Sequence, residues 1–195
     1  FGHGYIEYDA PTNPIFFENG NGLLYGSIEE QLYSYNPSSQ EIIILLDSLD
    51  FGKIVAIDEN YIYATRIGDT VVDVFAYDIQ NNMQEWLLAI PKSQGWDHQG
   101  YWLKLDNGKY YTLTNNGGSI DRGALIEIDI ENRTSRKTID FTDAKNPQGS
   151  LKLHSNGMVY GVTNRGGENN QGCVFKLDPK GDSYIIEASF SSALG

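Results

Sequence analysis

The sequence predicts an all-β fold, a β-propeller-like array of about four four-stranded blades that is part of a larger propeller. Three observations support this prediction. A long segment recurs later in the chain without insertion or deletion, and short β-rich segments alternate with turn residues throughout. No segment shows a sustained helical period with caps, so the regular structure is expected to be strand.

The strongest repeat lies in the second half of the chain, where residues 99–130 align with residues 148–179 at an offset of 49 (148 − 99). Eleven of the 32 aligned positions are identical, which is more than chance composition explains. The shared elements are visible in NGKYYTLTNNGG and NGMVYGVTNRGG, which both contain Asn-Gly-x-x-Tyr and a Gly-Gly pair. Weaker copies at 21–28 and 59–67 predict two further units upstream.

Each unit divides into four short strands, most clearly the last one. Its expected strands are SLKLH (150–154), MVYGVT (158–163), CVFKLD (173–178) and SYIIEASF (183–190). Between the first two strands, Asn156-Gly157 suits a tight hairpin because both residues tolerate positive φ angles, and Gly108 is expected to do the same in the preceding unit. Pro179 stands at the second position of a four-residue turn, where its fixed φ fits.

The blades are expected near residues 13–50, 51–91, 92–142 and 143–190, within one segment that covers 1–195. Residues 1–12 would be the end of a preceding blade or a closing strand. The last strand keeps an apolar stripe of Tyr184, Ile186 and Ala188. We therefore expect a partial ring whose end blades expose apolar faces, covered by further blades of the same polypeptide.

The segment GSLKLHSNGMVYGVTNRGGENNQGCVFKLDPKG resembles the GloVer tandem repeat, a propeller-like repeat of exported bacterial proteins. The resemblance is strong over about 92–190, whereas the two N-terminal units lack the Gly-Gly loop. It implies an extracellular or cell-surface location, or a periplasmic one, and it brings no established reaction or catalytic residue with it.

A second resemblance concerns one blade. Ala76-Tyr77-Asp78 followed by Trp86 is similar to the repeat of quinoprotein propellers, in which the Trp docks between neighbouring blades. The Thr-Gly-Lys of that repeat is replaced by Asn81-Asn82-Met83, and no other unit repeats the pattern. The resemblance therefore implies a blade and no quinone cofactor.

Composition restricts the partners. The chain has 26 acidic and 14 basic residues, a net charge of −12, and all of the excess lies in residues 1–97, which hold 15 acids and 3 bases. Such a surface repels phosphate, so neither nucleic acid nor an anionic membrane surface is an expected partner. No apolar run approaches the ~18 residues of a membrane span, and the single Cys173 excludes an intrachain disulfide.

The predicted ligand site lies on one face of the propeller. The loops before each first strand and between each second and third strand meet there beside the central channel, and aromatic and polar groups that converge form the usual ligand site. Its candidate residues are Arg66, Asp69, Trp96, Asp97, His98, Asp121, Arg122, Arg165 and Glu168. In the alternative interpretation, Trp96 anchors a contact between blades and the charged residues are solvated loop tips.

Other groups that could carry chemistry are interpreted as structural. The Gly-Gly loops 115–123 and 164–172 lack the helix or the Lys-Ser/Thr pair of a phosphate-binding loop, so glycine there is expected to serve wide β-connections with positive φ. Asp78, Asp129 and Asp178 recur at the end of the third strand, which predicts carboxylates that cap turns.

No metal site, cofactor or catalytic residue is predicted. Asp69 and Asp73 are conceivable calcium ligands, but they lack the spacing of a calcium loop, and no sequence motif of a known catalytic site is present. His154 ends a strand and is expected to be a packed residue.

These observations favour a non-catalytic, exported or cell-surface recognition or scaffold module with an unknown glycan, peptide or protein ligand. The alternative is a propeller-class enzyme, a hydrolase, lyase or cyclase that acts on a sugar or peptide at the channel mouth. Two carboxylates, or a His and a carboxylate, within about 3 to 9 Å of each other there would favour the enzyme.

Overall fold

The structure is a computed structural model that describes residues 17–18, 20–28, 31–46 and 53–191. All regular structure in this part of the chain is β-strand, and its sixteen strands form four antiparallel sheets of four strands each. The predicted all-β class and the four-stranded units are therefore confirmed. The described residues contain no helix with the length and apolar character needed to cross a bilayer.

We call the sheets blades 1 to 4. Blade 1 contains β1 (Phe17–Glu18), β2 (Leu24–Ile28), β3 (Gln31–Asn36) and β4 (Glu41–Leu46). Blade 2 contains β5 (Lys53–Ile57), β6 (Tyr61–Ile67), β7 (Val71–Asp78) and β8 (Met83–Pro91). Blade 3 contains β9 (Trp96–Lys104), β10 (Tyr110–Asn116), β11 (Ala124–Asp129) and β12 (Thr134–Asp140). Blade 4 contains β13 (Ala144–Leu153), β14 (Val159–Gly166), β15 (Cys173–Leu177) and β16 (Tyr184–Ser189). The remnant or closing strand expected in residues 1–12 lies outside the described residues.

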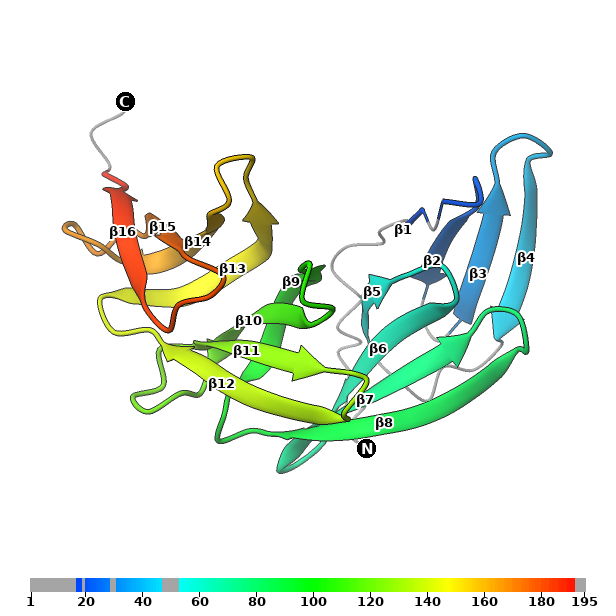
Figure 1. Ribbon diagram of the computed structural model, residues 1–195, viewed down its shortest axis with the longest axis horizontal. Coiled ribbons are helices and arrows are strands. Elements are labelled where there is room, and N and C mark those ends of the chain that lie inside the picture. Colours follow the sequence, from blue (N-terminus) through cyan, green and yellow to red (C-terminus); the bar gives the residue numbers. More distant parts are fainter. Residues whose placement is uncertain (1–16, 19, 29–30, 47–52, 192–195) are drawn as a thin grey trace, which may run out of the picture.

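The blades follow one another around an arc, with β1, β5, β9 and β13 on its inner side and β4, β8, β12 and β16 on its outer side (Figure 1). Neighbouring blades touch through these inner strands, and β8 also touches β12 on the outer side. We call the end of the blades that carries the connections between second and third strands the loop face. The opposite end, with the hairpins between first and second strands, is the turn face.

A hydrogen bond between an Asn and a Tyr explains the recurring Asn-Gly-x-x-Tyr element. In three blades the side-chain amide of the turn Asn donates to the hydroxyl of the Tyr four residues later. These bonds join Asn21 to Tyr25 (3.2 Å), Asn107 to Tyr111 (2.9 Å) and Asn156 to Tyr160 (3.0 Å). In blade 2 the carboxylate of Asp58 replaces the amide and accepts from Tyr63 at 2.9 Å. In each blade this hydrogen bond therefore holds the hairpin between the first and second strands against a Tyr of the second strand.

The predicted glycine conformations are confirmed. Gly108 and Gly157 have φ angles of 78° and 82°, as the tight hairpins require. Gly172, which closes the second Gly-Gly loop, has a φ of 91°, and a Cβ there would lie 2.2 Å from the carbonyl oxygen of Thr163. At Gly172 the chain therefore needs glycine both for its backbone angle and for the close approach of another strand.

The recurring aspartates cap turns, as predicted. Asp78 Oδ1 accepts from the backbone N–H groups of Gln80 and Asn81 at 2.9 and 3.0 Å. The same role belongs to Asp129, which accepts from the Asn132 N–H at 3.0 Å, and to Asp178, which accepts from the Lys180 N–H at 2.9 Å.

The hydrophobic core lies between the blades. Blades 1 and 2 share a cluster that includes Tyr25, Leu32, Ile54, Ile62, Phe75 and Tyr77. Blades 2 and 3 share one that includes Val55, Val74, Leu88, Ile90, Trp102 and Ile126. Blades 3 and 4 share one that includes Tyr111, Leu113, Leu125, Phe141, Val159, Phe175 and Leu177. Because each cluster draws on two sheets, neighbouring blades stabilise each other.

The exposed face of blade 4 differs from the prediction. Tyr184 and Ile186 were expected to be exposed, but they pair with Leu177 and Phe175 and pack with them against blade 3. The outward residue on β16 is Ile185, which is 60% exposed. Alternation along the strand places Tyr184 and Ile186 on the blade 3 side, and a bulge between Val174 and Phe175 turns the exposed Ala188 to the other side.

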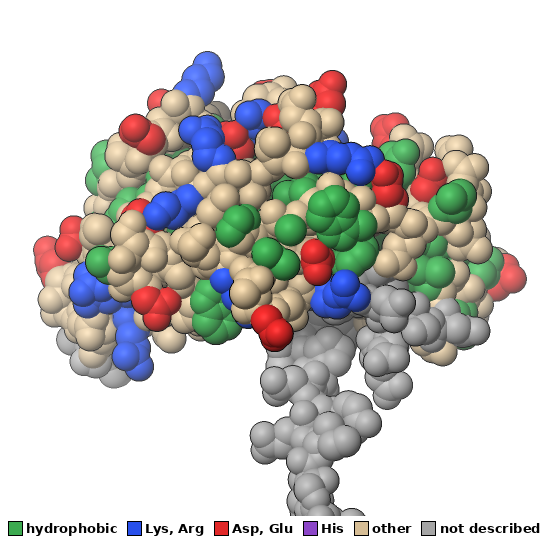
Figure 2. Space-filling model, turned by 90° about the horizontal axis from the view of Figure 1, so that it is seen from below, with side chains coloured by type: hydrophobic (Ala, Val, Ile, Leu, Met, Phe, Trp, Pro, Cys, Tyr) green, Lys and Arg blue, Asp and Glu red, His purple; other side chains and the backbone are tan. Residues whose placement is uncertain are grey.

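The outer rim carries hydrophobic groups of its own. Figure 2 views the molecule from the side on which β8 and β12 lie, and it shows hydrophobic side chains grouped near the middle, between charged side chains of both signs. Trp86 on β8 is 50% exposed, and its indole N–H donates to Asp73 of the same blade at 3.0 Å. Its ring therefore does not dock between blades, in contrast to the quinoprotein repeat.

Candidate functional site

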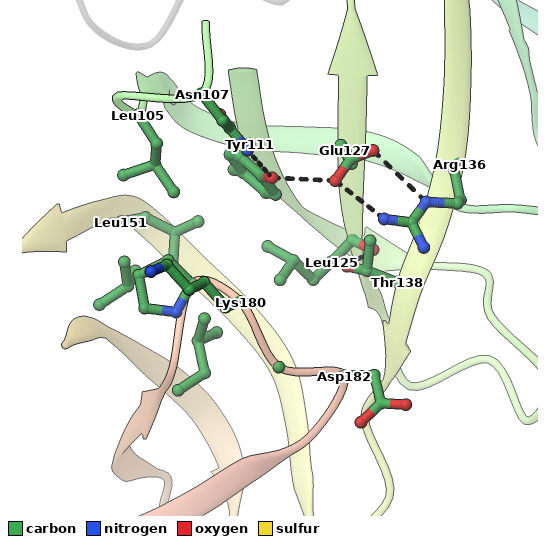
Figure 3. Close-up of a pocket in the computed structure, with 14 residues that line it drawn as sticks. Leu105, Asn107, Tyr111, Leu125, Glu127, Arg136, Thr138, Leu151, Lys180 and Asp182 are labelled. Atoms are coloured by element: carbon green, nitrogen blue, oxygen red, sulfur yellow. Dashed lines mark hydrogen bonds and ion pairs between the residues drawn. The ribbon is translucent and has the colours of Figure 1, made fainter. Parts of the chain in front are cut away.

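A cavity of about 490 Å³ opens on the turn face between blades 3 and 4 (Figure 3). Blade 3 contributes one wall through the β9–β10 hairpin and β10 to β12, and blade 4 contributes the other through β13 to β15 and the β15–β16 turn. The lining residues are Leu105, Asn107, Tyr111, Leu125, Glu127, Arg136 and Thr138 of blade 3, and Leu151, Val159, Leu177 and Pro179 to Asp182 of blade 4.

Glu127 is the centre of the polar wall. Its side chain is buried and accepts from Tyr111 at 2.9 Å, from Lys109 at 2.9 Å and from Arg136 at 2.9 Å. Burial acts to raise the pKa of Glu127, but the hydrogen bonds from Arg136, Lys109 and Tyr111 outweigh it and lower the pKa to about 2. The carboxylate is therefore anionic at neutral pH, and three donors fix its orientation. Figure 3 shows two of them, Tyr111 and Arg136.

The remaining lining combines an apolar floor with a charged rim. Leu151, Val159 and Leu177 belong to the cluster that joins blades 3 and 4. Lys180 and Asp182 are exposed in the turn between β15 and β16, on the other side of the cavity from Glu127. An apolar floor with a few fixed polar groups is typical of a ligand site.

A second carboxylate joins blades 2 and 3 on the turn face. Asp58 accepts from the hydroxyls of Tyr63 at 2.9 Å and Tyr110 at 3.1 Å, and Lys104 lies 3.6 Å away. Burial acts to raise the pKa of Asp58, but hydrogen bonds from the Asn60 N–H, Tyr63 and the Tyr61 N–H, with the Lys104 charge, lower it on balance. Burial first, and then neighbouring charge, raises the pKa of both Tyr63 and Tyr110.

An open depression of about 520 Å³ adjoins Asp58 and is lined mainly by the β5–β6 turn. Because the Asp58 carboxylate accepts hydrogen bonds from two buried phenols of different blades, we interpret Asp58, Tyr63 and Tyr110 as a link between blades 2 and 3.

The predicted residues on β9 start at the loop face but play mainly structural parts. Trp96 is partly buried against the cluster between blades 2 and 3, which supports the alternative interpretation of this residue. Asp97 Oδ2 accepts from the Asn115 side chain at 3.2 Å. His98 is only 5% exposed, and neither ring nitrogen has a hydrogen-bond partner among the described residues. Burial, with a smaller effect of the Lys53 charge, lowers the pKa of His98 to about 4.

The other predicted residues are distributed over the loop faces of three blades. In blade 2, Arg66 forms an ion pair with Asp73 at 3.5 Å, and Asp69 is exposed in the β6–β7 turn. In blade 3, Asp121 accepts from the Gly117 N–H at 2.7 Å, and Arg122 donates to the Thr142 carbonyl.

In blade 4, Arg165 and Glu168 are exposed near the end of β14. The loop face therefore brings Trp96, Asp97 and His98 together on one strand and leaves the charged residues at separate loop tips.

Two further predictions can be compared with the structure. His154 was expected to be packed, but it is exposed, and its Nδ1 accepts from the Asn156 N–H at 3.2 Å. The strand ends one residue before it, at Leu153, so the imidazole lies in the hairpin. Within the described ranges, no three His, Cys, Asp or Glu side chains lie close enough to hold a metal ion.

Sequence reasoning missed the cavity residues Tyr111, Glu127 and Arg136. A signal was present, because Glu127 aligns with Lys176 at the offset of 49, so the two copies have opposite charges at one position. The cavity between blades 3 and 4 could not be predicted from the sequence, because its walls come from strands that meet only after folding.

The chain matches the Gloeobacter/Verrucomicrobia repeat over residues 51–195. The chain belongs to this family. The match includes blade 2, although the resemblance in the sequence was strong only from about residue 92. No curated protein matches this member of the Gloeobacter/Verrucomicrobia repeat family.

Solved structures share the fold at low sequence identity. The extracellular domain of a protein assigned to the hybrid two-component systems of B. thetaiotaomicron matches with a TM-score of 0.60 and 10% identity over 91% of this chain and 22% of its own. A chain of a nidogen/laminin complex matches with a TM-score of 0.62 and 12% identity over 90% and 65%. A puromycin-hydrolysing peptidase of Mycobacterium tuberculosis matches with a TM-score of 0.58 and 12% identity over 88% and 28%. The repeat chain thus spans between about a fifth and two thirds of these proteins, and the likeness shows a β-propeller-like fold.

Proposed function

We propose that this chain is a non-catalytic recognition module of an exported or cell-surface protein, and that the cavity between blades 3 and 4 is its ligand site. The observation that carries the proposal is the fixed arrangement of Tyr111, Glu127 and Arg136 above an apolar floor. A ligand with an apolar part and hydrogen-bonding groups, such as a glycan or a peptide, fits such a cavity.

The electrostatics favour binding over catalysis. A general acid or base works best when its pKa lies near the operating pH, whereas the pKa of Glu127 is about 2 and that of His98 is about 4. Glu127 is also held by three donors, so its oxygens are engaged in the wall of the cavity. These groups can position a ligand, but they are poorly suited to exchange protons at neutral pH.

The proposed location is supported by the family and the fold. The Gloeobacter/Verrucomicrobia repeat covers most of the chain, and one protein of similar fold is the extracellular domain of a bacterial two-component system. Another similar chain comes from a nidogen/laminin complex, which is an assembly of two proteins.

The test is a glycan and peptide array, followed by two matched charge exchanges. K180E/D182K inverts the exposed rim of the cavity, and R165E/E168K inverts two exposed residues of the loop face, while both keep the net charge. We expect the first variant to weaken binding of the array hit at least about tenfold, whereas the second stays within about twofold. Urea unfolding midpoints should match the unmodified chain in both cases.

Three outcomes would contradict the proposal. Loss of binding only in R165E/E168K would place the site on the loop face. Cleavage or rearrangement of the hit, detected by mass spectrometry, would support the enzyme alternative. A chain that binds nothing on either array would favour a scaffold role.

A further inference from the structure

The face of blade 4 that points away from blade 3 is equivalent, in the repeat, to the face of blade 3 that packs against blade 4. At the offset of 49, Tyr111, Leu113 and Leu125 of blade 3 correspond to Tyr160, Val162 and Val174 of blade 4. The pairing is also the same, because Leu113 pairs with Leu125 across β10 and β11, and Val162 pairs with Val174 across β14 and β15. The two sets therefore occupy equivalent places in their sheets.

In blade 3 this surface is covered by blade 4. Tyr111, Leu113 and Leu125 are buried in the cluster that also contains Val159 and Phe175 of blade 4. In blade 4 the equivalent surface is open: Val162 is 41% exposed, and Ile185, which pairs with Lys176 on the outer strand, is 60% exposed. Each blade thus has one face that packs on the preceding blade and one face that receives the next.

Both blades have an ion pair between the third and fourth strands, with the signs exchanged, although the fourth-strand position equivalent to Arg136 is Ile185 and not Glu187. In blade 3 the third strand supplies Glu127 and the fourth supplies Arg136, whereas in blade 4 the third strand supplies Lys176 and the fourth supplies Glu187. An ion pair between the same two strands keeps charge balanced on a face that is otherwise partly apolar. The surface therefore has the composition of a blade contact.

We propose that the open face of blade 4, formed by Tyr160, Val162, Val174, Lys176 and Ile185, docks a further blade of the same repeat type in the same polypeptide. The arriving blade would present the face that blade 4 presents to blade 3, on which Val159, Phe175 and Leu177 are buried. Docking would also enclose a second cavity next to Tyr160 and Lys176, equivalent to the one beside Tyr111 and Glu127. Its wall would carry a cation in place of the anion.

The test inserts a second copy of residues 143–191 after residue 191, which keeps the period of 49 residues and retains the rest of the chain. The copied sequence is chosen because it packs on the equivalent face of blade 3. Exposure of the docking face is measured by maleimide labelling of I185C, since Cys173 is buried. S155C is the control, because the equivalent residue of blade 3, Asp106, stays exposed although blade 4 is docked there.

We expect the insertion to slow labelling of I185C at least about tenfold and to leave S155C unchanged, with one cooperative thermal transition at a higher midpoint. V162D should leave the midpoint of the original chain unchanged but remove the gain in the extended chain. Equal labelling of I185C in both chains, or an inserted blade that melts separately or stays unfolded, would overturn the proposal. Concentration-dependent protection of I185C in the original chain would assign the face to a second copy instead.

Discussion

The hydroxyl of Tyr111 donates to Glu127 at 2.9 Å across the β10–β11 pair, at the wall of the cavity between blades 3 and 4. The same hydroxyl accepts from the Asn107 amide at 2.9 Å, so the hairpin motif and the polar wall form one hydrogen-bonded chain. Tyr111 thus has two roles: it stabilises the repeated hairpin, and it orients the buried carboxylate of Glu127 in the proposed site.

Replacing Glu127 by Gln should reduce stability in a way that depends on pH. The pKa of Glu127 is lowered from 4.5 to about 2 in the folded chain, so its contribution is complete above about pH 5 and is lost as the pH falls from about 4.5 to 2. We expect E127Q to lower the free energy of unfolding by about 2 kcal/mol at pH 7, with little difference near pH 2. Urea titrations at several pH values measure this, and E131Q, an exposed neighbour, is the control. A difference that does not change with pH would contradict the assignment.

His98 should make the fold sensitive to mild acid. Its pKa falls from 6.5 to about 4 on folding, so the unfolded chain binds the proton more tightly, and stability is lost as the pH falls from about 6.5 to 4. We expect H98F to remove roughly 2 kcal/mol of this loss, seen as a smaller shift of the urea midpoint between pH 7.5 and pH 4.5. H154Q, which removes an exposed histidine, should behave like the unmodified chain. An unchanged acid profile in H98F would show that other groups dominate.

The glycines should differ in their tolerance to substitution. Gly157 has open space around its Cβ position and a φ of 82°, so G157V should cost about 1 kcal/mol or more through backbone strain. Gly172 adds a contact of 2.2 Å with the Thr163 carbonyl oxygen, so even G172A should cost more, about 2 to 4 kcal/mol. The control is G181A, where the Cβ meets no atom closer than 3.5 Å. Thermal unfolding ranks the three, and a G181A chain as unstable as G172A would refute the steric argument.

Loss of Asp58 should uncouple blades 2 and 3. D58A leaves the buried hydroxyls of Tyr63 and Tyr110 without their acceptor, and we expect a loss of about 3 kcal/mol. E59A removes an exposed carboxylate next to it and should be nearly neutral. Because the pKa of both phenols is raised, the folded chain holds their protons more tightly, and stability should fall as the pH rises above about 10. Chemical denaturation at pH 7 and pH 10.5 checks both statements, and equal stability of D58A and E59A would argue against the link.

The all-β class, the four-stranded units and the turn chemistry could be predicted from the amino-acid sequence because they rest on local rules. Gly157 needs a positive φ and Asp78 caps its turn through bonds that span only a few residues. A repeat at a fixed offset also reports that the same unit is built twice, whatever its surroundings. The family and its propeller-like fold follow from these signals.

The site and the exposed faces could not be predicted in the same way, because they depend on which side of each sheet meets a neighbour. Alternation along β16 leaves Ile185 exposed and turns the partly buried Ile186 toward blade 3, although both are apolar residues in one strand. Glu127 meets Tyr111 only when β10 and β11 pair, and the cavity beside them exists only because blade 4 packs against blade 3. Short-range rules specify each hairpin, but burial, pKa and cavity shape arise from contacts between strands that are distant in the chain.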